Sequence, residues 1–343
     1  MSPPPPASVA LSSPLDDAAL ASISIPAIEE ARLRRQAFIA VLVAAGCIGF
    51  SPIFVRLADT GPAAIGFWRM LFAVGPTALW AYAEWRAMKA RHVATVGAGV
   101  RLRPFSGRQF AFGTLAGLFF AADLVFFHAA LANTSTANSV LLGNMAPVFV
   151  LLFAWACLGE RPTLGLFIAL VLAMAGSAII VLDSTSAAAG INSLLGDLLA
   201  TGAAACYAAY MIVVRVMRRG GHTHGGVVRV PGLGGGMVAL ISTAAGAVFC
   251  LAYAVGAGEQ IVPASLQGFL AVVGLGIVAH AFGQGLATFA LGRLTAGTIS
   301  IVLLLQIVIG ISMAALLFGE VPSLTVLFGG GLIVAGILAV RPR

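Results

Sequence analysis

"LGERPT", residues 158–163, and "FGEVPS", residues 318–323, are one short pattern written twice in this chain, 160 residues apart. In each copy the glycine suits the left-handed residue that ends a helix, and the proline suits the first turn of the next helix. The glutamate lies favourably near the positive N-terminal end of that second helix. We therefore interpret Glu160 and Glu320 as parts of two helix hairpins, placed at equivalent points of a duplicated chain.

The duplication extends beyond these hairpins. At an offset of 159 or 160 residues, further short matches pair the front of the chain with its back. They are Cys47 with Cys206, Val55–Arg56 with Val214–Arg215, Leu131 with Leu291, Ala154 with Ala314, Pro162 with Pro322 and Ala175–Gly176 with Ala335–Gly336. We predict two copies of one unit, over residues 37–183 and 195–341, joined by a linker at 184–194.

The composition places both copies in a membrane. The chain has 343 residues, of which 60% are hydrophobic and 9% charged, and its mean hydropathy is +1.04. Soluble domains carry roughly 25% charged residues. The apolar residues form blocks long enough for membrane-spanning helices, not the short alternating segments of a β-barrel. The blocks are 37–58, 63–84, 110–132, 136–158, 162–182, 195–216, 234–256, 266–289, 296–318 and 322–340. We predict an all-α polytopic membrane protein with ten transmembrane helices.

The number of helices in each copy fixes how the copies are related. Five is an odd number, so the second copy enters the membrane from the opposite side to the first. The expected architecture is an inverted-topology repeat, which is typical of secondary transporters with a binding site near the membrane midplane between the repeats.

The first 36 residues differ from the rest of the chain. They begin "MSPPPPASVALSSPLDD", which is rich in Pro, Ser and Ala and has no basic start before an apolar core. That composition is a poor match to a signal peptide and favours disorder. We predict a disordered tail over residues 1–36.

The net charge of +7 follows the expected topology. Basic residues concentrate in cytoplasmic loops. If the tail is cytoplasmic, nearly all of the 19 Lys and Arg residues fall in the tail, in the loops after the second, fourth, sixth and eighth helices, and at the C-terminus. We therefore predict that both termini are cytoplasmic. Membrane lipid is the expected partner of this charge, and we expect no nucleic-acid partner.

Three features together resemble a known family. They are "GFWR" at 66–69, "NSVLLGNMAPVF" at 138–149, and the repeated Gly-Glu at the ends of the fourth and ninth helices. The chain resembles the drug/metabolite transporter superfamily, and within it the EamA family of ten-helix metabolite exporters. The resemblance implies a bacterial inner-membrane exporter of a small metabolite. One position departs from the family, since Pro147 of the fourth helix has Ile307 at its counterpart, where the family often has another proline.

Two charges lie at a similar depth inside adjacent helices. At 1.5 Å per residue, Arg69 lies about 9 Å and Asp123 about 13 Å below the outer surface. They could form a neutral structural pair. They could instead bind a zwitterion, with Arg69 taking a carboxylate and Asp123 an ammonium. Asp123 could also carry a coupling proton. His128 shares no helix face with Asp123, and we interpret it as a satisfied histidine near the interface.

Further polar residues fall within the predicted helices. The candidate substrate-binding residues are Arg69, Asp123, Asn144, Tyr207, Tyr210, His280 and Gln306. The candidate hinge residues are Pro52, Pro76 and Pro147, because a proline leaves the carbonyl four residues earlier without its helical donor. The neighbouring aromatic residues Phe119, Phe120, Phe126 and Phe127 could line an aromatic pocket, but we interpret them as packing residues.

The function that follows is secondary transport of a small polar metabolite, such as an amino acid or a derivative, by alternating access. No phosphate-binding loop or hydrolase motif occurs, so we expect neither an ATP-driven pump nor an enzyme, and neither a cofactor nor a metal site. The alternative is a membrane-embedded enzyme of lipid or isoprenoid metabolism, which would need clustered carboxylates or histidines. A non-transporting structural or sensory protein is a third reading. We expect a monomer or a homodimer.

Overall fold

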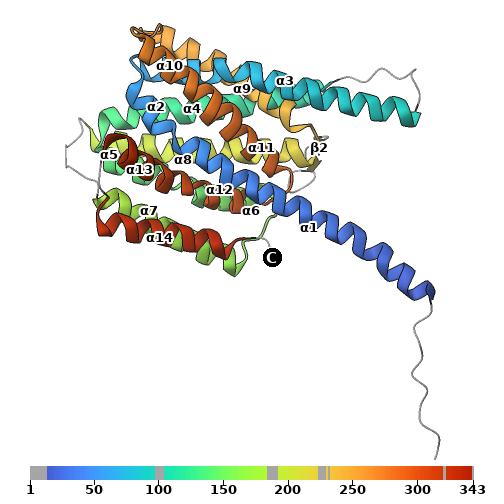
Figure 1. Ribbon diagram of the computed structural model, residues 1–343. Coiled ribbons are helices and arrows are strands. Elements are labelled where there is room, and N and C mark those ends of the chain that lie inside the picture. The colour runs from blue at the N-terminus through green and yellow to red at the C-terminus, as the bar shows by residue number, and fades with distance from the viewer. Residues whose placement is uncertain are drawn as a thin grey trace, which may run out of the picture.

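The computed structural model describes residues 14–96, 104–183, 192–222, 229–230, 232–319 and 322–341. Within these ranges, nine helical segments are long and apolar enough to cross a membrane, and a tenth, α14, has 16 residues. They lie side by side in one bundle (Figure 1). The prediction of a polytopic all-α membrane protein is therefore confirmed.

Several spans consist of more than one helix. The first half contains α1 (Pro14–Gly49), α2 (Ser51–Leu57), α3 (Pro62–Val96), α4 (Gly107–Asn133), α5 (Thr136–Gly143), α6 (Ala146–Leu158) and α7 (Leu164–Asp183). The second half contains α8 (Ser193–Arg219), α9 (Gly235–Gly256), α10 (Leu266–Gly274), the π-helix η1 (Leu275–Gln284), α11 (Gly285–Leu291), α12 (Ala296–Leu303), α13 (Leu305–Phe318) and α14 (Leu324–Ala339). Two short antiparallel strands, β1 (Gly221–His222) and β2 (Arg229–Val230), follow α8.

Glycine contacts show that the two halves are inverted. The fifth helices of the halves, α7 and α14, pack so closely that a β-carbon at Gly176 would overlap the carbonyl oxygen of Gly329. A β-carbon at Gly336 would lie 2.8 Å from the carbonyl oxygen of Ala169. Because residue numbers rise along α7 as they fall along α14, these equivalent helices run antiparallel. The absence of side chains at these glycines is what permits the close approach.

The second helices of the two halves show the same relationship. A β-carbon at Gly66 of α3 would lie 3.1 Å from Sγ of Cys250 in α9, and one at Gly236 of α9 would lie 2.5 Å from the backbone nitrogen of Ala81 in α3. The contacts again run in opposite directions along the chain. Both pairs of equivalent helices therefore place the second repeat upside down relative to the first.

The predicted hairpin glycines have the expected backbone. Gly159 and Gly319 end α6 and α13 with φ angles of 67° and 69°, in the left-handed region. Glu320 and much of the predicted linker, residues 184–191, lie outside the described residues.

Helix breaks occur next to only some of the candidate hinge prolines. The first span breaks at Phe50, two residues before Pro52, and the fourth breaks at Asn144–Met145, two residues before Pro147. The second span continues through Pro76 as one helix. The ninth span breaks at Leu304 without a proline. The fourth and ninth spans are thus interrupted at similar points, although the counterpart of Pro147 in the ninth span is Ile307 and not a proline. Whether these breaks bend during function stays a prediction.

The eighth span departs from its counterpart in the first half. Residues Leu275–Gln284 form the π-helix η1, whereas the third span, α4, is α-helical throughout. Short π-helical stretches in proteins often occur at functional sites.

The N-terminal segment differs from its prediction. A disordered tail was expected over residues 1–36, but α1 begins at Pro14 and extends out of the bundle (Figure 1). Propagating an existing helix costs far less than starting one, and the segment contains Ala, Leu, Glu and Arg, which favour helix. Arg34 also donates to Glu30 at 2.6 Å, one turn away. Residues 1–13 lie outside the described part of the chain.

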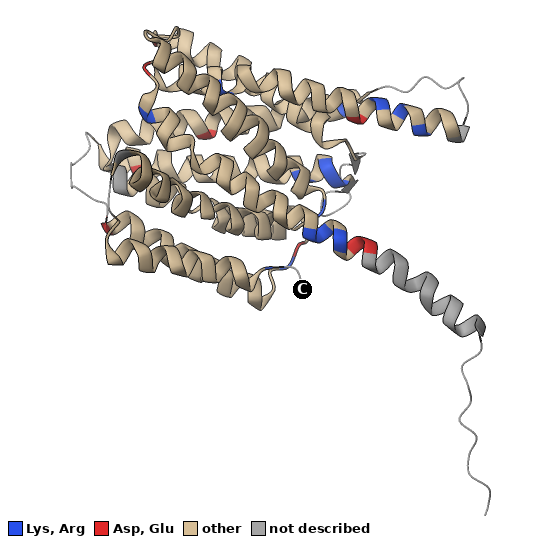
Figure 2. Cartoon of the chain, in the orientation of Figure 1, with Lys and Arg blue, Asp and Glu red and all other residues tan. Residues whose placement is uncertain are grey.

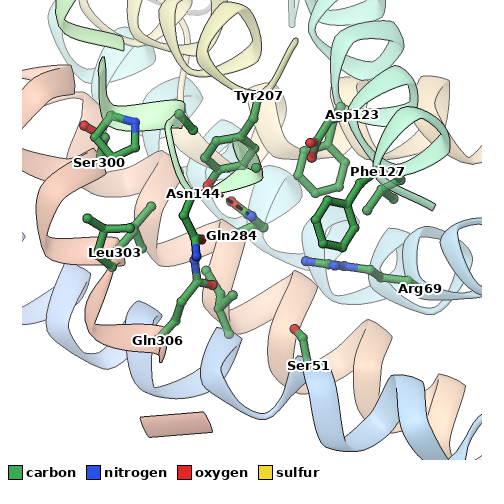
Figure 3. Close-up of a pocket in the computed structure, with 17 residues that line it drawn as sticks. Ser51, Arg69, Asp123, Phe127, Asn144, Tyr207, Gln284, Ser300, Leu303 and Gln306 are labelled. Atoms are coloured by element: carbon green, nitrogen blue, oxygen red, sulfur yellow. Dashed lines mark hydrogen bonds between the residues drawn. The ribbon is translucent and has the colours of Figure 1, made fainter. Parts of the chain in front are cut away.

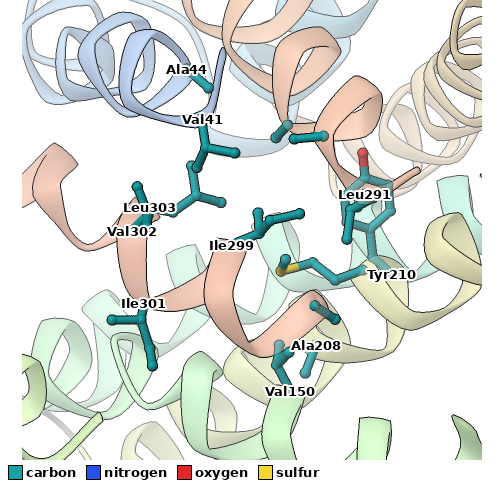
Figure 4. Packing of buried hydrophobic residues seen from close by; sticks show 14 of the residues in the cluster. Val41, Ala44, Val150, Ala208, Tyr210, Leu291, Ile299, Ile301, Val302 and Leu303 are labelled. Atoms are coloured by element: carbon teal, nitrogen blue, oxygen red, sulfur yellow. The ribbon is translucent and has the colours of Figure 1, made fainter. Parts of the chain in front are cut away.

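Charged residues divide the bundle into two unlike ends (Figure 2). The C-terminus and most described Lys and Arg residues lie at one end, which we call the terminal end. The loops after α2, α4, α9 and α13 lie at the other, which we call the opposite end. Between them, the described core is apolar and rich in alanine (Figure 4). This layout leaves the few polar side chains of the interior as candidates for a site.

Candidate substrate cavity

A cavity of about 200 Å³ lies where seven spans from both halves meet (Figure 3). Drug-sized ligands occupy pockets of roughly 300–1,000 Å³, so this volume suits a small metabolite. The lining residues are Ile48, Ser51, Arg69, Phe120, Asp123, Leu124, Phe127, Gly143, Asn144, Ala146, Pro147, Tyr207, Gln284, Ser300, Leu303, Leu304 and Gln306.

Arg69 brings a buried cation to this cavity from α3. Its side chain is 8% exposed, and its guanidinium carbon lies 5.4 Å from the ring centroid of Phe120. The ring face attracts a cation, although more weakly than a carboxylate does. The buried Nε atom of Arg69 has no hydrogen-bond partner among the described residues. The guanidinium therefore keeps a donor available for a bound anion.

Asp123 brings a half-buried carboxylate from α4. Figure 3 shows Asp123 and Arg69 on the same wall of the cavity. In the part of the chain that the structure describes, neither a hydrogen bond nor an ion pair within 4.0 Å joins the two. The neutral structural pair, one of the three readings of these residues, is not formed here. Both charges remain available to a molecule in the cavity.

Amide side chains line the opposite wall. Asn144 comes from the break in the fourth span and Gln306 from α13 (Figure 3). The Nδ2 atom of Asn144 is buried without a partner in the described structure. Pro147 cannot donate to the carbonyl of Gly143, and both residues line the cavity. The helix break thus places a free amide donor and an underused backbone acceptor at the same site.

Tyr207 and Gln284 connect the cavity to the second repeat. Gln284, the last residue of η1, donates from Nε2 to the hydroxyl of Tyr207 in α8 at 3.4 Å. The hydroxyl proton of Tyr207 remains available for a ligand.

The cavity includes some of the predicted site residues and leaves others aside. Arg69, Asp123, Asn144, Tyr207, Gln306 and Pro147 line it. His280 and Tyr210 lie behind Phe120, with ring centroids 5.2 Å and 4.9 Å from the Phe120 centroid. Nε2 of His280 shares a 3.0 Å hydrogen bond with the hydroxyl of Thr243. These two candidates therefore support the cavity wall and do not face its interior.

Two further expectations concern residues near the rim. His128 bonds through Nδ1 to the carbonyl of its own helix at Leu124, at 2.7 Å, so it is satisfied as expected. Pro52 and Pro76 do not line the cavity.

The candidate binding residues predicted from the sequence did not include Ser51, Phe120, Phe127, Gln284 and Ser300, which also line the cavity. A signal existed for the two aromatic residues. Phe120, Asp123, Leu124 and Phe127 are spaced as one face of a helix, so placing Asp123 in a cavity also places its neighbours there. Gln284, like Gln306, is a polar residue inside an apolar block, and this is a sequence signal for a cavity residue. Nothing in the sequence marks the hydroxyls of Ser51 and Ser300. The Ser300 hydroxyl donates to the carbonyl oxygen of Gly297 in its own helix at 2.9 Å, a bond that serines in helices commonly form.

Comparison with known proteins adds to this geometry. The model of the EamA-like transporter family matches residues 35–182 and again 194–341. The chain belongs to the EamA-like transporter family. It is therefore a multi-pass membrane protein and a transporter of small molecules, built from two tandem repeats. The chain also resembles a solved protein crystal structure with 18% sequence identity and a TM-score of 0.70, over 89% of this chain and 97% of that one. At this identity the likeness shows the fold alone. No curated protein matches the chain by sequence.

Proposed function

We propose that this EamA-like transporter carries a zwitterionic metabolite, such as an amino acid or a derivative, across the bacterial inner membrane by alternating access. The observation that carries the proposal is the pair of opposite charges, Arg69 and Asp123, that face one small cavity without pairing with each other. A zwitterion satisfies both at once, with its carboxylate on the guanidinium and its ammonium on Asp123.

The remaining lining residues fit such a cargo. Asn144, Gln306 and the hydroxyl of Tyr207 supply hydrogen bonds to the polar end. Phe120, Phe127 and Leu303 supply an apolar surface for a side chain. An enzyme of lipid metabolism would need clustered acids or histidines, but the residues that line this cavity include one carboxylate, Asp123, and no histidine.

The direction of insertion follows from charge. Since basic residues gather at the terminal end (Figure 2), that end faces the cytoplasm under the positive-inside rule. Both termini are then cytoplasmic, and export runs from the terminal end to the opposite end.

The test uses purified protein in proteoliposomes and measures counterflow of radiolabelled leucine, together with its decarboxylated amine and its deaminated acid. The expected result is flux of the zwitterion well above that of either single-charge analogue. Arg69→Ala should lose the zwitterion and the acid, and Asp123→Asn should lose the zwitterion and the amine. Equal flux of all three compounds, or of none across a panel of amino acids, would overturn the proposal.

A further inference from the structure

A buried ion pair closes the terminal end of the bundle. Arg215, near the end of α8, is 2% exposed, and Glu160, after α6, has a side chain that is 20% exposed. The Nε atom of Arg215 donates to Oε1 of Glu160 at 2.5 Å, and its Nη2 atom reaches the same oxygen. Glu160 belongs to the first repeat and Arg215 to the second, so the pair joins the two halves.

The same arginine also holds a third segment. Its Nη1 atom donates to the carbonyl oxygen of Leu291 at 2.8 Å and to that of Leu294. Leu291 ends α11, and Leu294 lies in the turn before α12. One side chain thus ties together the terminal ends of the fourth, sixth, eighth and ninth spans. These four spans also supply the cavity residues Pro147, Tyr207, Gln284 and Ser300.

An apolar layer separates this ion pair from the cavity. Val150, Met211, Leu291 and Ile299 are each no more than 1% exposed and belong to one packed cluster. Figure 4 shows Val150, Ala208, Ile299 and Leu291 meeting between the helices of the two halves. A molecule in the cavity therefore cannot leave through the terminal end unless this layer parts.

The hydrogen bonds of this ion pair are incomplete, unlike those expected of a permanent structural contact. The second carboxylate oxygen of Glu160, Oε2, is buried without a hydrogen-bond partner in the described structure. Burying two charges carries a large desolvation penalty that only complete hydrogen bonding offsets. Opening the terminal end would rehydrate both groups, so the closed and open forms lie closer in free energy than the contact geometry alone suggests.

We propose that Arg215 and Glu160 form a latch that holds the terminal end of the cavity closed in one state of the transport cycle and releases it in the other. The inference rests on alternating access in the proposed function. It adds the residues that set the balance between the two states. The repeat supplies a matched control, because Arg56 is the sequence counterpart of Arg215 but lies at the opposite end, in the last turn of α2.

The experiment measures access to the apolar layer. The four native cysteines are replaced by alanine, and Ala208→Cys places a thiol within the layer. Labelling by a membrane-impermeant maleimide is timed in proteoliposomes from the terminal side. Glu160→Gln removes the charge with little change of shape, and we expect it to speed labelling about tenfold, the effect of a modest shift in a two-state equilibrium. Arg56→Gln, a change at the opposite end, should not speed this labelling.

The outcomes separate the latch from the cargo. Unchanged labelling in Glu160→Gln, or an equal rise in Arg56→Gln, overturns the latch. Should Glu160→Gln fail to fold, Arg215→Lys tests the same point, since it keeps the charge but loses the fork that binds Glu160 and the two carbonyls together. Labelling needs no substrate. A protein that moves no zwitterion but labels faster therefore supports the latch while the proposed cargo fails.

Discussion

The ring of Phe120, in the third span of the first repeat, packs edge to face against the ring of His280, in the third span of the second repeat, with centroids 5.2 Å apart. The two halves of the transporter therefore touch through corresponding spans, one with a phenylalanine and the other with a histidine. Phe120 also lies beside the guanidinium of Arg69, so the contact between the repeats forms part of the cavity wall.

We predict that the charge of Arg69 contributes to ligand binding more than to stability. It is buried, its Nε atom has no partner in the described structure, and it forms no ion pair with Asp123. Replacing it with methionine, which has a similar length and no charge, should leave the free energy of unfolding within about 1 kcal/mol of wild type or raise it. Zwitterion binding should weaken roughly 10- to 100-fold, the effect of losing a charged hydrogen bond. Thermal unfolding and equilibrium binding in detergent check the two effects, and a collapse of stability would mean that Arg69 is structural.

The contact between α7 and α14 depends on the absence of a side chain at Gly176. A β-carbon there would overlap the carbonyl of Gly329, so Gly176→Ala should cost about 1–3 kcal/mol through overpacking. Gly165 lies in the same helix with nothing within 4 Å of its β-position. Gly165→Ala is therefore the control and should be neutral or stabilising, as Gly-to-Ala changes in helices are. The melting temperatures of the two purified variants test this prediction. Equal shifts in Gly176→Ala and Gly165→Ala would refute the packing argument.

The hydrogen bond between Thr243 and His280 stabilises the region behind the cavity. The Nδ1 atom of His280 already lacks a partner in the described structure, so Thr243→Val would leave both ring nitrogens buried and unsatisfied. We expect a loss of about 1–3 kcal/mol in the free energy of unfolding. Thr243→Ser keeps the hydroxyl and should lose much less. If Thr243→Val destabilises the protein no more than Thr243→Ser does, the hydrogen bond to His280 contributes little to stability.

The inverted repeat predicts opposite accessibility for two equivalent prolines. Pro162 follows α6 and Pro322 precedes α14, at the same place in each repeat. In a protein without native cysteines, Pro162→Cys and Pro322→Cys should react with an impermeant maleimide from opposite sides of the membrane. The side on which Pro162→Cys reacts also reports which end faces the cytoplasm, and we expect it to be protected in intact cells. Labelling of both from one side would contradict the antiparallel arrangement of α7 and α14.

Much of the fold was predictable because it depends on composition and repetition. Apolar blocks give the spans, and the Gly-Glu-x-Pro hairpins give the offset between the halves. Arg69, Asp123, Asn144 and Gln306, which line the cavity, were identifiable as candidate site residues, because polar groups are costly in hydrocarbon wherever they point.

What escaped prediction depends on helix rotation and on contacts between distant segments. Polarity alone does not tell that His280 turns toward Thr243 while Gln284, four residues later, faces the cavity. The hairpin pattern around Glu160 does not predict its ion pair with Arg215, because the packing of α6 against α8 brings together two residues that are 55 positions apart. The π-helix η1 has no signature in the sequence.

The π-helix has a consequence for the conformational equilibrium of the transporter without cargo. If the two repeats were identical, exchanging their roles would turn one facing of the protein into the other, and both facings would be equally populated without a cargo gradient. The wide turn of Leu275–Gln284 exists in one repeat alone, since α4 holds regular geometry throughout. The two-fold relationship between the repeats is therefore broken at the level of the backbone, so nothing requires the two facings of the empty protein to be equally populated.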